Sequence, residues 1–308
     1  MPFRVRLIIS CALVAIVVSA NDEAVGESPI SESDSNAKLV NEVFAEWRRR
    51  PTVYRSMNAT VVDKKIIRRP PPEDLPDLFL DVPDEVQWRF RSDGDKSRLD
   101  YDLAHAQILR SGTHIDTFDG KVSKSFFPKA SASGGVEYGA GFIRADGFAR
   151  SDRLFKIAPL RWAFLGVNYG GYRLDQKSFT VSKERRIINI ANCVILQCVD
   201  PNGLSHSFWC DPQKDYAILR YALNRGDILI QQLDCSVEKH PSGMWLPQKW
   251  TVVWFESDGR IAEMGEMQML TCIVNPKFDD PDLFDFTFPV GTVINDARQD
   301  LKAVPSLP

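Results

Sequence analysis

The chain has 308 residues, of which 44% are hydrophobic, 26% charged and 10% aromatic. This composition is typical of a folded globular protein and excludes disordered, collagen-like and coiled-coil chains. The formal net charge of −3 argues against nucleic acid as a partner, because a nucleic-acid-binding surface needs an excess of basic side chains.

Residues 1–20 have the order of a secretory signal, with two arginines, an apolar run over 7–18 and small residues at 18–20. A membrane-spanning helix needs about 20 apolar residues, and this run is shorter. We therefore expect a signal peptide that is cleaved near Ala20, no stable membrane span after cleavage, and a mature protein in the periplasm or outside the cell.

Residues 21–35 are acidic and serine-rich with few large apolar side chains, which predicts a disordered tether. A helix is predicted over 36–50, where apolar residues recur at helical spacing, and Pro51 should end it. We expect the apolar stripe of this helix to plug the fold: Leu39, Val43, Phe44 and Trp47.

Strand-like alternation begins after this helix, with a first candidate strand over 52–62. A proline-rich connection over 68–83 leads to two predicted hairpins, whose turns lie at 92–95 and at 119–120. In the first hairpin Trp88 and Phe90 should face Leu99 and Tyr101 across the ladder. The Gly-, Ala- and Ser-rich stretch 129–150 is predicted to be a loop, either a mobile flap or disordered.

A short amphipathic helix is predicted within 152–166. Six strand-like runs with short turns between them follow it, over 187–199, 204–210, 214–223, 228–239, 244–255 and 260–274, and a last strand is predicted over 283–288. The fold class is therefore α+β and mostly antiparallel, a large curved sheet of about 11 strands with a few helices covering its concave face.

No catalytic motif stands out, because the chain has no G-x-S-x-G elbow and only four histidines. His114 and Asp116 share one face of a strand, which we interpret as a solvated face or a local hydrogen bond. His206 alternates with apolar residues and is interpreted as a satisfied core or rim histidine. We predict no catalytic residue, no metal site and no cofactor.

Five cysteines remain after signal cleavage, and a disulfide is possible in an oxidising compartment. With a two-residue loop at 200–203, Cys193 would lie opposite Cys210. A type I turn with Gly203 as a bulge would instead shift the register by one residue and separate the pair. A bridge between Cys193 and Cys210 and a set of buried free thiols both remain open.

Apolar strand faces are the most distinctive feature of the sequence. A curved sheet with only two or three short helical segments has more concave apolar area than those helices fill, which predicts a ligand cavity. The candidates for its lining are Trp88, Phe90, Leu99, Tyr101, Trp250, Val252 and Trp254.

The order of elements resembles the outer-membrane lipoprotein carrier superfamily, which is LolA- and LolB-like. The resemblance rests on six stretches: the amphipathic helix from Val40 to Trp47, the hairpin 88–101, the D-G-K turn within 115–121, Cys210-Asp211-Pro212 with Tyr216, Gly243-Met244-Trp245-Leu246-Pro247, and 288–292. It implies a single domain over 36–296, followed by a tail over 297–308. It also implies an unclosed β-barrel that holds acyl chains or acylated polypeptide between sheet and helices.

We therefore expect a secreted or periplasmic, non-enzymatic binding protein with an apolar partner, either an acyl-chain ligand or an acylated protein. Two alternatives stay open. One is an extracytoplasmic scaffold or regulatory partner-binding protein with a filled core. The other is a cell-envelope hydrolase without a recognised motif.

Overall fold

The computed structural model describes residues 32–67, 85–102, 112–130, 136–145, 155–165, 174–182, 186–188 and 191–298. The predicted signal peptide, most of the tether, the proline-rich connection and most of the C-terminal tail lie outside these residues. Within the described ranges no helix is long and apolar enough to cross a membrane.

Two α-helices lie in the described ranges, α1 (Glu32–Val53) and α3 (Ala158–Leu165). The strands are β1 (Ser56–Ile67), β2 (Glu85–Asp93), β3 (Lys96–Asp102), β4 (Thr113–Phe118), β5 (Ser123–Ala130), β6 (Val136–Arg144), β7 (Thr180–Val181), β8 (Arg186–Ile188), β9 (Ala191–Val199), β10 (Leu204–Asp211), β11 (Ala217–Arg225), β12 (Ile228–Lys239), β13 (Trp245–Phe255), β14 (Ile261–Val274) and β15 (Val293–Asp296).

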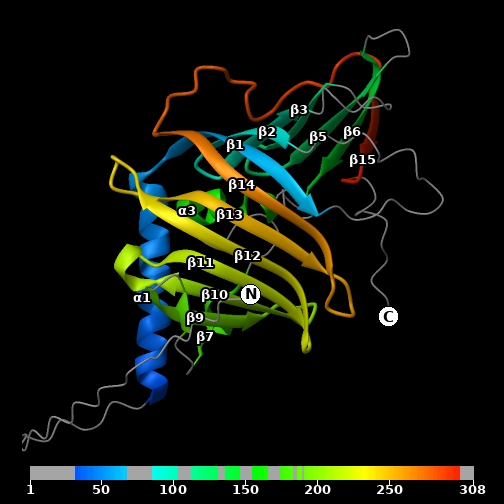
Figure 1. Cartoon of the computed structure of the whole chain (residues 1–308). Helices are drawn as coiled ribbons and strands as arrows, with labels where there is room; N and C mark the ends of the chain where they lie inside the picture. Colours follow the sequence, from blue (N-terminus) through cyan, green and yellow to red (C-terminus); the bar gives the residue numbers. More distant parts are fainter. Residues whose placement is uncertain are drawn as a thin grey trace, which may run out of the picture.

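One 15-stranded sheet contains all the strands of the described residues, in the order β15-β6-β5-β4-β3-β2-β1-β14-β13-β12-β11-β10-β9-β7, with β8 paired to β9 off this path. Its pairs are antiparallel except for β15 and β6. The sheet consists of two meanders joined by β1, whose Val61 lies opposite Trp88 of β2 and Met269 of β14. Its two ends are not paired with each other, so the predicted unclosed, mostly antiparallel sheet is confirmed (Figure 1).

The two helices pack on one face of this sheet, which we call the inner face. α1 contacts α3 and β7, and α3 contacts β11 and β13, so both helices lie over the second meander (Figure 1). The predicted stripe of α1 is largely buried there, with Val43, Phe44 and Trp47 in the main apolar core and Leu39 packed at its edge.

The boundaries of α1 differ from the prediction at both ends. The helix begins at Glu32, inside the predicted tether, and continues through Pro51 to Val53. Pro51 is tolerated because it lies in the last turn, where the backbone N–H of Tyr54 still donates to the carbonyl of Arg50 at 2.8 Å.

The prediction of a loop over 129–150 is wrong for its middle part, which forms β6. The glycines of this strand make room for aromatic rings on the outer face. A Cβ atom on Gly139 would lie 2.1 Å from the Phe126 ring, and one on Gly141 would lie 2.7 Å from the Phe288 ring. The glycine-rich composition that suggested a loop is therefore explained by close packing in the sheet.

The predicted last strand over 283–288 is also wrong, because these residues cross the outer face of the sheet as an irregular strap. Arg98 donates to the carbonyl of Leu283 at 3.1 Å, and Lys124 donates to that of Phe286 at 3.2 Å. Phe286 and Phe288 pack on Phe126 of β5 from outside, and β15 is the strand that follows them. Together with β6, β7 and β8, it raises the strand number above the expected 11.

Of the two possibilities left open for Cys193 and Cys210, the structure has the second, because both residues are free thiols and no bridge joins them. Cys210 lies opposite Val194, and Gly203 in the connecting turn has a φ of 77°. The register is therefore shifted by one residue. Cys210 belongs to the inner core and Cys193 to a smaller core on the outer face.

Candidate functional site

The seven residues predicted to line a cavity all lie on the inner face and belong to one apolar core. Four come from the β2–β3 hairpin, where Trp88 faces Tyr101 and Phe90 faces Leu99, as predicted. The other three, Trp250, Val252 and Trp254, come from β13, which is separated from β2 by β1 and β14. The structure places them as two groups on one continuous face, and every one of them is buried.

A row of rings runs across five strands of the first meander on this face. We call Trp88, Tyr101, His114, Phe127 and Phe142 the aromatic row; neighbouring ring centroids are 4.9, 4.9, 5.3 and 5.7 Å apart. Trp88, Tyr101 and His114 are buried, whereas Phe127 and Phe142 at the far end are only partly buried. The row offers an apolar surface with one accessible end.

Of the two interpretations of His114, a solvated face or a local hydrogen bond, the first is wrong, since the residue is fully buried. Its ring stacks on Tyr101, and its Nδ1 lies 3.3 Å from the Tyr101 hydroxyl oxygen. Sequence reasoning also missed Phe127 and Phe142. The alternation of Ser123, Ser125 and Phe127 contained the signal, because it places Phe127 on the same face of the sheet as His114.

Lys156 lies between the two groups of cavity candidates and was not predicted. Its Nζ is 6.0 Å from the centroid of Trp88 and 5.6 Å from that of Trp254. It is also 2.9 Å from Asp63 Oδ2 and 3.3 Å from Glu263 Oε1. Since a buried charge must be paired, we assign Lys156 a structural role that ties the α3 segment to the sheet.

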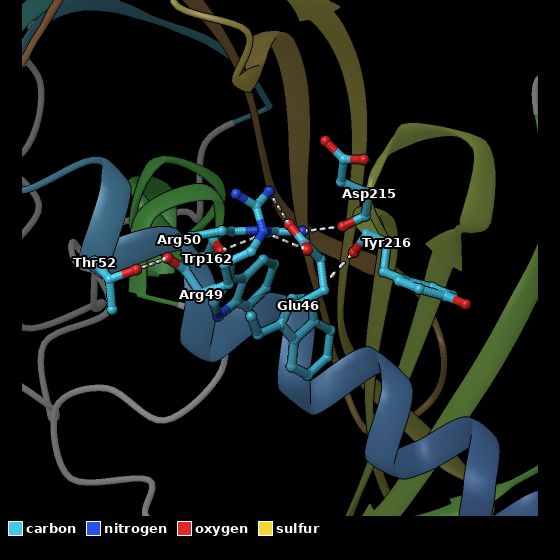
Figure 2. Close-up of polar contacts among 8 residues, drawn as sticks. Glu46, Arg49, Arg50, Thr52, Trp162, Asp215 and Tyr216 are labelled. Carbon is cyan, nitrogen blue, oxygen red and sulfur yellow. Dashed lines mark hydrogen bonds and ion pairs between the residues drawn. The ribbon is translucent and has the colours of Figure 1, made fainter.

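The C-terminal half of α1 is fixed to the turn between β10 and β11 by polar contacts (Figure 2). Trp47 Nε1 donates to the carbonyl of Tyr216 at 3.1 Å, and Arg50 donates to the carbonyls of Trp162, at 3.1 Å, and Asp215. Asp215 and Tyr216 have φ values of 52° and 55°, a strained conformation for non-glycine residues. The contacts from α1 hold this turn in place.

A hollow of about 290 Å³ lies between α1 and the ends of β9 and β10. Its lining comprises Leu39, Asn192, Cys193, Val194, Asp211, Pro212, Gln213 and Tyr216. Leu39 is the one predicted plug residue that it contains, and the seven cavity candidates lie elsewhere. Burial raises the pKa of Cys193 to about 11, so this thiol is protonated at neutral pH and is a poor nucleophile.

His206 is buried with two polar partners, as its interpretation as a satisfied core histidine requires. Its Nδ1 lies 2.9 Å from the Tyr221 hydroxyl and its Nε2 lies 3.6 Å from Asp200 Oδ2. Burial lowers the pKa of the imidazole, and the carboxylate of Asp200 opposes that shift. In the described part of the chain, no group of three or more His, Cys, Asp or Glu residues is placed to hold a metal ion.

No protein-family model matches the chain, and no curated protein matches it in sequence. Among solved structures it is similar to a DUF1329 family protein from Desulfovibrio piger, with a TM-score of 0.47 and 12% identity over 79% of this chain and 96% of that one. It is also similar to a LolA superfamily protein from Nitrosomonas europaea, with a TM-score of 0.47 and 11% identity over 79% and 96%.

Proposed function

We propose that this chain is an extracytoplasmic, non-enzymatic binding protein that holds an apolar ligand, an acyl chain or an acylated protein, against the inner face of its sheet. The observation that carries the proposal is the aromatic row of the first meander. The two described helices cover the second meander, whereas the row continues to the partly buried rings of Phe127 and Phe142.

The chemistry of the row suits an acyl chain. Its rings lie side by side across the strands, and those of Phe127 and Phe142 are partly exposed, so a flexible hydrocarbon can reach the row from that end. Each methylene group removed from water there contributes about 0.8 kcal/mol. Affinity should therefore rise with chain length until the apolar surface is covered.

The polar groups of the inner face support binding over catalysis. The imidazoles of His114 and His206 each lie against a tyrosine hydroxyl in the core. Burial raises the pKa of Cys198 to about 12, which leaves its thiol protonated and unreactive. These groups stabilise the core and are poorly placed to reach a substrate.

The test is a titration of delipidated protein with fatty-acyl probes of eight to eighteen carbons, followed by tryptophan fluorescence. Affinity should increase with length, and Phe127→Ala and Phe142→Ala should each weaken binding by about 1 kcal/mol, roughly fivefold. Phe255 is a matched control, because it is partly buried on β13 next to Trp254 but on the opposite face. Binding that is absent, or independent of chain length, would contradict the proposal.

A partner-binding protein with a filled core is the second candidate. Trp250, Val252 and Phe44 are almost completely buried and pack in one continuous core. Trp88, Phe90, Leu99 and Tyr101 of the first meander are buried in the same core. If no space opens beside them for a ligand, acyl probes will not bind, and the function will reside on the surface instead.

A further inference from the structure

The inner face of β2, β3, β4 and β5 has three levels of side chains along the strands. Trp88, Tyr101 and His114 form the first level, together with Phe127. The second comprises Phe90, Leu99, Asp116 and Ser125, and the third comprises Ser92, Ser97, Phe118 and Ser123. Because a strand rises about 3.3 Å per residue, the first and third levels are about 13 Å apart. The face therefore changes from aromatic to polar toward the hairpin turns.

Two serines at the polar end have hydroxyl groups that the described structure leaves without a hydrogen bond. Ser92 and Ser97 lie directly opposite each other on β2 and β3, and both are completely buried. Among the residues that the structure describes, neither Oγ atom has a hydrogen-bond partner. Buried hydroxyls without partners are rare because each costs free energy, so this pair requires an explanation.

The charges near these serines restrict what they could bind. The basic side chains of β2 and β3, namely Arg89, Arg91, Lys96 and Arg98, alternate with the inner residues and lie on the outer face. Arg91 and Arg98 both form ion pairs there with Asp100. Asp116, one level away from the serines on the inner face, is an acid. A carboxylate would thus meet no basic side chain from these two strands.

We propose that Ser92 and Ser97 bind the head group of an amphipathic ligand, and that this head group is uncharged and bears a hydroxyl group, as in a fatty alcohol or an acylglycerol. The inference rests on the proposed function, since the acyl chain of this ligand lies along the aromatic row. Each serine hydroxyl both donates and accepts a hydrogen bond, so the pair can satisfy a ligand hydroxyl in both of its roles.

The experiment compares three probes with the same twelve-carbon chain: dodecan-1-ol, its methyl ether and dodecanoate. The wild-type protein should bind the alcohol about tenfold more tightly than either of the other probes. The ether cannot donate a hydrogen bond, and the carboxylate would meet no basic side chain from β2 or β3. In Ser92→Ala/Ser97→Ala this preference for the alcohol should disappear while binding of the ether is unchanged. Each single variant should lose part of the preference for the alcohol, so the test does not depend on the double variant.

Ser207→Ala is the matched control. Ser207 is also buried, but it lies on the other face of the sheet on β10, where it accepts a hydrogen bond from Gln197 Nε2 at 3.2 Å. This variant should keep the wild-type preference. The melting temperature of the Ser92 and Ser97 variants should stay the same or rise, because no hydrogen bond within the protein is removed.

Two results would overturn the inference and leave the proposed function intact: equal affinity of the wild-type protein for all three probes, or a preference for the alcohol that survives in the double variant. The second would show that the hydroxyls serve only the fold or an ordered water. Failure of every probe to bind the wild-type protein would overturn both the inference and the proposed function.

Discussion

Each meander of the sheet has one tyrosine–histidine pair on its inner face. The Tyr101 hydroxyl lies 3.3 Å from His114, and the Tyr221 hydroxyl lies 2.9 Å from His206. In both pairs the two residues come from adjacent strands, so the ladder fixes their separation. In the second pair, the Asp200 carboxylate also lies near the other ring nitrogen of His206, at 3.6 Å.

His206 should make stability depend on pH. Burial holds the pKa of its imidazole below the usual value of about 6.5, so the folded protein favours the neutral ring. This contribution is complete above the unfolded pKa and is lost as pH falls below it. Unfolding in urea should therefore show lower stability at pH 5 than at pH 7.5.

Replacing His206 separates its contribution to the pH dependence of stability from the contributions of other titratable groups. His206→Gln should cost about 1 to 2 kcal/mol at pH 7.5, because the contact with Tyr221 is weakened, and should flatten the dependence between pH 7.5 and 5. His240→Gln is the control, since His240 lies at a turn and contacts Ser242 at 2.8 Å. An unchanged slope in His206→Gln would show that other groups carry the pH dependence.

At the scale of elements, α1 is joined to the rest of the molecule by an apolar stripe and by polar contacts at its C-terminal end. The Phe44 ring lies 5.1 Å from Trp47 and 4.9 Å from Phe179, measured between centroids. Phe179 comes just before β7, so this contact connects the helix to the last strand of the sheet order.

Phe44→Asp should destabilise the protein by at least about 2 kcal/mol, because a buried ring is lost and a charge is left without a partner in the core. Ala45→Asp is the matched control, since it places the same charge at the next residue, which is exposed. Thermal unfolding of both variants is the measurement. Melting of Phe44→Asp at the wild-type temperature would show that α1 contributes little to the fold.

Secondary structure was predicted correctly where the hydrophobic period of a segment and the turn residues beside it indicate the same element. In the β2–β3 hairpin the alternation places Trp88 and Phe90 correctly, and Gly94 with its φ of 58° supplies the turn. We did not predict β6, because its glycines are required by packing: a Cβ atom on Gly139 or Gly141 would clash with the ring of Phe126 or Phe288. Such a constraint is tertiary and leaves no periodic signal in the strand itself.

The same reasoning applies to the candidate site. Alternation predicted which residues of β2, β3 and β13 share a face, because that depends on the strand alone. It did not predict Lys156, whose place between Trp88 and Trp254 depends on how α3 lies across the sheet. A lysine in the otherwise apolar stretch 155–160 was the available signal.

At the scale of the whole molecule, we expect export with removal of a signal peptide. N-terminal sequencing of the protein isolated from the cell envelope or the medium should begin near Asn21, because the small residues at 18–20 suit signal peptidase. An Ala20→Arg variant should block processing and increase the apparent mass. An unprocessed wild-type protein in the membrane fraction would contradict this prediction and favour an uncleaved anchor.

The pairing of β1 with β14 has a consequence for how the molecule is made. Met57 lies opposite Val274 in the ladder, and the carbonyl of Ser56 accepts a hydrogen bond from the backbone N–H of Asn275 at 2.8 Å. The first strand of the chain therefore pairs with one of the last. During synthesis β1 therefore has an unsatisfied edge until nearly the entire chain has left the ribosome. Contacts of such high sequence separation form slowly. This delay keeps the central seam of the sheet open while the chain is being made, which suits the export that we predict, because a narrow secretion channel threads an unfolded chain.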